Sequence, residues 1–71
     1  MEVTAIFEKD DEWWIAWTEE VPGAFGQGHT LEECRESLRD AVQMMLEEIH
    51  AQSLQETEGR PVIRERITVS L

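Results

Sequence analysis

The acidic residues of this chain are the first candidates for chemistry, because grouped carboxylates can hold a metal ion or move a proton. Two acidic clusters lie near the N-terminus, at residues 10–12 and 19–20. Adjacent residues of an extended chain point to opposite sides, so neither cluster converges on one ion. A metal-dependent nuclease would need several carboxylates from distant positions, with Glu8 and Asp40 as conceivable members. The spacing gives no support for such a set.

The histidines and the cysteine also lack a recognisable catalytic pattern. His29 is a residue type often used in acid–base catalysis, but no nucleophile or carboxylate motif accompanies it. His29, His50 and Cys34 do not have the ligand spacing of a structural zinc site. Cys34 falls on an apolar helix stripe, where a thiol is typically a small core side chain. We expect no catalytic residue, no metal and no cofactor.

Gly26 and Gly28 precede a helix start, where a phosphate-binding loop would place its glycines. The spacing is not G-x-x-x-x-G-K-[ST], and no lysine follows. Glu32 and Glu33 would place negative charge in the first turn, which opposes an anion. We therefore reject a phosphate-binding loop.

Residues 30–54 predict one long amphipathic helix. Thr30 followed by Glu33 is a capping box, in which each side chain satisfies an amide at the helix start. Apolar residues then recur at steps of three and four, which places them on one stripe: Leu31, Cys34, Leu38, Ala41, Val42, Met45, Leu46 and Ile49. Such a helix is on the order of 30 Å long, and its stripe needs a sheet to pack against.

Two strands precede this helix, at residues 3–7 and 13–18, with the charged residues 8–12 as the turn. Alternation places Trp13 and Trp17 on one face of the second strand and Trp14 on the other. Because one helix covers one face only, the other face keeps tryptophan exposed, which is typical of an interaction surface. The alternative is a structural role for Trp14, packed across the hairpin.

The remaining segments complete an α+β fold. Residues 19–28 form a loop in which Phe25 is the apolar residue expected to plug the seam between sheet and helix, and a brief third edge strand fits at residues 26–29. Residues 62–71 alternate apolar and polar side chains and predict a last strand. The order is β-β-β-α-β, a small antiparallel-rich sheet with one long helix packed on one face, in a single domain over residues 1–71.

Composition narrows the classes of partner. The chain has 16 acidic and 6 basic residues, a formal net charge of -10, which repels nucleic acid and favours a basic protein. No apolar run is long enough to span a membrane, and one unpaired cysteine indicates the cytoplasm. A domain of 71 residues is marginal alone, so we expect a homodimer or a higher oligomer.

A resemblance to a known family rests on the Pro22-Gly23 loop and on the following run Gln-Gly-x-Thr-Leu-Glu-Glu at residues 27–33. Over residues 3–52 the chain resembles the HicB-like antitoxins of type II toxin–antitoxin pairs. The resemblance implies a degraded ribonuclease-H-like fold without catalytic carboxylates. It also implies a partner, a small basic HicA-type toxin that cleaves mRNA and is covered by direct contact. Many members carry a C-terminal DNA-binding domain, which we do not expect here.

These observations predict an antitoxin-like protein that is not an enzyme and binds neither nucleic acid nor membrane. The alternatives are an orphan homo-oligomeric scaffold of the same fold and a residual metal-dependent nuclease. The expected contacts with the toxin are Trp13, Trp14, Trp17, Glu19, Glu20 and Phe25. The expected contacts between copies of the chain are Ile63, Ile67, Val69 and Leu71.

Overall fold

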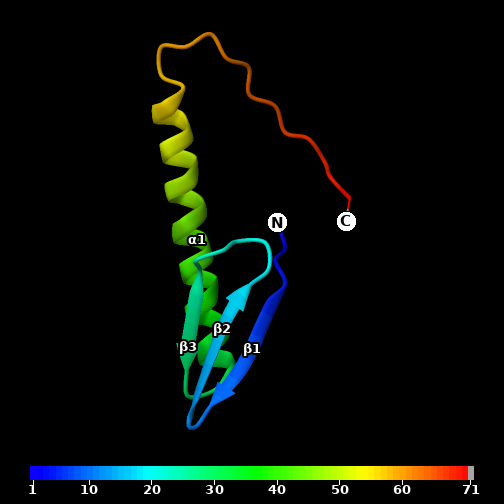
Figure 1. Ribbon diagram of the computed structural model, residues 1–71, viewed down its shortest axis with the longest axis vertical. Helices are drawn as coiled ribbons and strands as arrows, with labels where there is room; N and C mark the ends of the chain where they lie inside the picture. The colour runs from blue at the N-terminus through cyan, green and yellow to red at the C-terminus, as the bar shows by residue number, and fades with distance from the viewer. Residues whose placement is uncertain (71) are drawn as a thin grey trace.

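The computed structural model describes residues 1–70 and has an α+β fold, as predicted. Strands β1 (Ala5–Asp10), β2 (Trp13–Thr18) and β3 (Phe25–Gly28) form an open antiparallel sheet in the order β1-β2-β3. The helix α1 (Leu31–Glu56) follows and covers one face of this sheet (Figure 1). The other face of the sheet is open.

The β1–β2 hairpin is longer than the sequence predicted. Asp10 pairs with Trp13, so residues 8–10 belong to the strand and only Asp11 and Glu12 form the turn. Asp11 has a φ of 55°, a left-handed conformation that aspartate tolerates. The prediction of a turn over residues 8–12 is wrong because ladder hydrogen bonds come from the backbone, and an edge strand accommodates charged side chains.

The strand register decides which side chains face the helix. Phe7 lies opposite Ala16, and both point to the α1 side, where Ala16 is fully buried. Trp17 lies opposite Ile6 on β1 and opposite Phe25 on β3. Cross-strand partners share a face, so these three point away from the helix. The predicted alternation along β2 is confirmed.

Two glycines let the helix lie directly on β3. A Cβ atom at Gly26 would be 2.5 Å from the backbone nitrogen of Leu38, and one at Gly28 would be 2.6 Å from that of Cys34. No carbon atom fits at such distances, so backbone packs on backbone at both positions. The glycines before the helix are therefore packing residues.

The start of α1 is capped by Thr30 as the sequence predicted, but Glu33 bonds the residue before the cap and not the amide of Thr30 itself. The Thr30 hydroxyl accepts a hydrogen bond from the Glu33 amide, at 3.1 Å. The Glu33 carboxylate accepts from the His29 amide, at 2.9 Å, one residue before the cap. The bond to Thr30 satisfies an amide that a helix start leaves without a partner, and the bond to Glu33 holds the residue before the cap.

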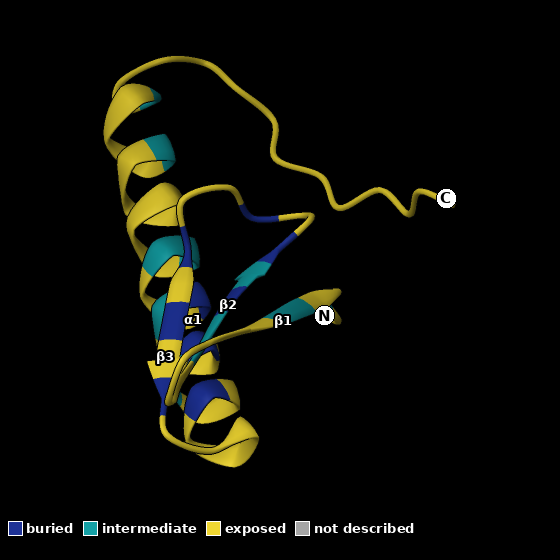
Figure 2. Cartoon of the chain, turned by 60° about the horizontal axis from the view of Figure 1, so that its bottom comes forward, coloured by how far each residue is buried: buried dark blue, intermediate teal, exposed yellow. Residues whose placement is uncertain are grey.

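The core is small and lies under the first half of the helix (Figure 2). Its buried apolar residues are Ala16, Val21, Ala24, Cys34, Leu38 and Val42. Beyond Val42 the helix continues to Glu56, a rise of about 21 Å. Most residues of this second half are exposed, including Met44, Ile49 and Leu54.

The predicted last strand is not formed in the described chain. Residues 61–70 are exposed and carry no regular secondary structure, and they lead away from the end of α1 (Figure 1). Arg64 holds this segment by donating to the Ser53 carbonyl oxygen at 3.0 Å and to the Thr57 hydroxyl at 2.8 Å. Alternation indicates strand-forming side chains, but a strand also needs a neighbouring edge, which the end of a helix does not supply.

Candidate protein-binding surface

The open face of the sheet gathers the exposed aromatic side chains of the hairpin. We call it the open-face patch, and its members are Ile6, Trp13, Ile15, Trp17 and Phe25. Phe25 is 66% exposed and Trp13 is 44% exposed, which is high for large apolar side chains. Trp17 lies on the central strand and has a patch member on each side, Ile6 on β1 and Phe25 on β3.

His29 supports one end of the open-face patch. Its ring stacks on Trp13, with 3.9 Å between ring centroids and 30° between the planes. The His29 amide is fixed by Glu33, so the imidazole stands at a defined place beside the indole. His29 therefore has a packing role here, which restricts the Trp13 side chain.

Carboxylates border the open-face patch on β1. Glu8 lies opposite Ile15 and Asp10 lies opposite Trp13, so both acidic side chains share the open face with these neighbours. Both are exposed. An apolar centre with an acidic border suits a basic protein surface.

The structure separates the predicted aromatic contacts. Trp13, Trp17 and Phe25 lie together on the open face. Trp14 lies on the opposite face, packed against the core, with the Lys9 ammonium 5.7 Å from its ring centroid. The interpretation of Phe25 as a plug of the sheet–helix seam is wrong, because β3 turns its glycines toward the helix and Phe25 away from it.

The predicted acidic contacts Glu19 and Glu20 follow β2, and both are exposed. The Glu20 carboxylate accepts from the Thr4 amide at 2.7 Å and from the Thr4 hydroxyl at 2.8 Å. These hydrogen bonds lower the pKa of Glu20. The Glu19 amide donates to the Thr4 carbonyl oxygen at 3.2 Å. This pair therefore fastens the N-terminal segment to the end of β2.

Sequence reasoning missed four members of this surface. Ile6 and Ile15 belong to the patch, and Glu8 and Asp10 border it. The alternation along β2 already places Ile15 on the same face as Trp13 and Trp17. The other three required the hairpin register, which follows from the two-residue turn and not from the charged composition of residues 8–12.

The expected contacts between copies lie in the segment after the helix. Ile63 is 96% exposed and Ile67 is 76% exposed, and Val69 is exposed as well. Leu71 lies outside the described residues. The structure therefore leaves these three apolar side chains without cover from the described chain.

The carboxylates considered for a nuclease do not converge. Glu8 points to the open face, whereas Asp40 belongs to the helix that covers the opposite face. Within residues 1–70, no group of three His, Cys, Asp or Glu side chains is placed to hold a metal ion. The described chain also holds no helix with the length and apolar character that crossing a lipid bilayer demands.

We expect the Cys34 thiol to be unreactive in the folded chain. It is fully buried, and this burial raises the pKa of the thiol, so little reactive thiolate forms. Modification by a thiol reagent at pH 8 should be roughly 100-fold slower than in urea, because the thiol reacts only from opened forms. Equal rates with and without urea would show that the Cys34 site is open.

The chain is similar to a protein of the UPF0150 family. The chain is 45% identical over 49 residues to UPF0150 protein ssl0738 from Synechocystis sp. (strain ATCC 27184 / PCC 6803 / Kazusa). The aligned part covers 66% of this chain and 67% of that protein. No protein-family model matches the chain, and no solved structure matches it.

Proposed function

This chain belongs to the UPF0150 family, and we propose that it acts as an antitoxin-like protein, which neutralises a small basic RNA-cleaving toxin by direct contact. The proposal joins the family membership to the HicB-like motif of residues 22–33. The observation that carries it is the open-face patch, an aromatic surface in a chain whose own helix covers the other side of the sheet.

The open-face patch has the make-up of a protein interface. Tryptophan and phenylalanine are enriched at interface centres, where each contributes a large apolar area. Trp17 lies between Phe25 and Ile6, its cross-strand neighbours. A partner that covers these side chains removes the apolar area from water, which drives association.

The charge of the chain supports a basic partner. The net charge is -10, and Glu8 and Asp10 stand beside the apolar centre. A protein that cleaves RNA presents cationic side chains to the phosphates of its substrate. Carboxylates placed against those cations would compete with RNA, and the patch would shield the surrounding surface. Neutralisation then needs no chemistry from this chain.

Co-expression tests the proposal. The gene beside the one for this chain is expected to encode a small basic protein, whose expression alone arrests growth. Expression of this chain in the same cells should restore growth and leave cellular mRNA intact. Continued arrest at equal protein levels, with the chain folded and soluble, would contradict the proposal.

A further inference from the structure

The open-face patch is apolar at the end farthest from the hairpin turn. There Ile6, Trp17 and Phe25 lie side by side across β1, β2 and β3. Ile15, Trp17 and Phe25 also line a hollow of about 570 Å³, which Gln27 borders on β3. A large apolar side chain of a partner fills such a hollow, and buried anchors of this kind contribute most of the binding energy at an interface.

The surface is acidic toward the hairpin turn. Glu8 and Asp10 are alternate residues of β1, so they lie about 6.6 Å apart along the strand on the open face. Residues 11–12, which form the turn, are acidic and exposed as well. Lys9 does not neutralise this charge on the open face, because its ammonium lies over Trp14 on the helix side of the sheet. A partner therefore meets apolar surface at one end and negative charge at the other.

The open face has the width of one helix. Neighbouring strands are about 4.8 Å apart, so the strands of this three-stranded sheet span about 10 Å. An α-helix with its side chains has a diameter of about 10–12 Å. One helix laid along β2 therefore covers the whole face, whereas a partner sheet of several strands would extend beyond both edges.

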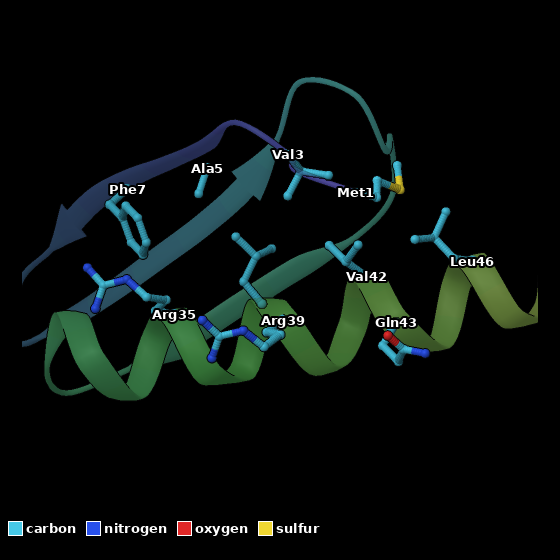
Figure 3. Close-up of a pocket in the computed structure, with 10 residues that line it drawn as sticks. Met1, Val3, Ala5, Phe7, Arg35, Arg39, Val42, Gln43 and Leu46 are labelled. Atoms are coloured by element: carbon cyan, nitrogen blue, oxygen red, sulfur yellow. The ribbon is translucent and has the colours of Figure 1, made fainter. Parts of the chain in front are cut away.

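The opposite face shows how this sheet packs against a helix. Val3, Ala5 and Phe7 alternate along the chain and point toward α1, and Val42 and Leu46 of the helix point back toward them (Figure 3). Alternate residues of a strand are about 6.6 Å apart, and residues four apart on a helix rise about 6 Å. Because these spacings match, a second helix on the open face would place residues four apart over successive side chains of β2.

An extended segment suits the open face less well than a helix does. The N–H and C=O groups of an extended segment need partners, and the backbone groups of a sheet bond within the plane of the sheet. A helix satisfies most of its backbone groups internally, so it packs on a surface of side chains. The open face therefore favours a helical partner.

We infer that the open-face patch binds a basic amphipathic helix, which belongs to the toxin if the proposed function, on which this inference rests, is correct. The helix lies along β2 with its apolar side chains over Ile15 and Trp17, and one of them enters the hollow beside Phe25. Lysine or arginine side chains on its flank pair with Glu8 and Asp10. The more cationic end of the helix lies toward the hairpin turn.

A synthetic peptide tests the inference without the toxin. The probe has about 18 residues, or roughly five helical turns, with leucine at steps of three and four and lysine on the flanks of this stripe. We expect a Kd of about 10 μM, with a gain of helix in circular dichroism and a change in tryptophan fluorescence. A peptide of the same composition in scrambled order should bind about 10-fold more weakly, because it forms no apolar stripe.

Neutral variants of the chain locate the cationic flank of the helix. Glu8→Gln/Asp10→Asn should bind the ordered peptide about 10-fold more weakly and with a smaller dependence on salt. Glu48→Gln/Glu56→Gln is the matched control, because it removes the same charge from exposed positions on the second half of α1. This control should bind within about twofold of the unchanged chain, since distant surface charges are screened by salt.

A charge exchange gives the sharpest readout. Glu8→Lys/Asp10→Lys should reject the lysine peptide and bind a peptide in which glutamate replaces each lysine. The chain remains acidic overall after this change, so a preference for the acidic peptide would arise only from local pairing.

Three results would overturn the inference. They are equal binding of the ordered and scrambled peptides, equal losses in the two neutral variants, and a charge-exchanged chain that still prefers the lysine peptide. If the toxin binds this chain but the ordered peptide does not, the inference fails and the proposed function stands. If the peptide binds as described and the toxin does not, the proposed function fails, and the open-face patch takes a helix of another protein.

Discussion

Replacing Gly26 by alanine should lower the free energy of unfolding by about 3 kcal/mol or more, the upper range for overpacking a core. The added Cβ would be 2.5 Å from the Leu38 nitrogen and 2.8 Å from the Cys34 carbonyl oxygen. Both are backbone atoms of the helix, so no side chain can move aside. The helix has to shift from the sheet, which loosens its packing along β3. Urea denaturation measures the change.

Gly59 provides the matched control. It has a φ of 74°, and a Cβ there would meet nothing within 4 Å. Gly59→Ala should cost about 1–2 kcal/mol, from the left-handed backbone alone. A Gly26→Ala chain as stable as the Gly59→Ala chain would show that the helix does not lie on β3 as described. Wild-type stability for a domain of this size is roughly 4–10 kcal/mol, so the difference is measurable.

Replacing Trp17 by alanine should weaken toxin binding by at least about 30-fold, the effect of losing a central aromatic contact. Trp17 is only partly buried in the free chain, so the fold should survive the change. Its neighbours Ile6 and Phe25 would lose the ring that connects them across the sheet. The dissociation constant, measured by titration calorimetry, gives the effect.

Met44 is a suitable control for Trp17. It is 67% exposed on the second half of the helix, away from the open-face patch. Met44→Ala should bind the toxin as tightly as the unchanged chain. If both variants bind normally, the open-face patch is not the binding surface. If Met44→Ala alone weakens binding, the partner contacts the helix.

The sequence predicted the helix and the faces of the hairpin, because both follow from local patterns. Thr30 and Glu33 mark the helix start through side-chain bonds within one turn. The alternation of β2 predicts which tryptophans share a face, whatever the neighbouring strands are. Such features need no knowledge of the distant contacts that the fold creates.

The remaining features depend on contacts between distant segments. The role of Gly26 appears only when a helix backbone is placed against β3. Glycine within a strand is a signal for such an approach, although it does not name the partner. In the segment after the helix, alternation predicted a strand at residues 62–71. The sequence did not show which strand it would pair with. No sequence pattern predicted that Arg64 would anchor this segment at the end of the helix.

The central claim is that the acidic, aromatic open face binds a basic protein, and a direct titration tests it. The chain and the small basic protein of the neighbouring gene should form a complex at micromolar concentration or below. Tryptophan fluorescence should change as Trp13 and Trp17 become covered, and added salt should slow association because opposite charges steer the encounter. No complex at micromolar concentration, or a complex with unchanged tryptophan fluorescence and no dependence on salt, would contradict the account.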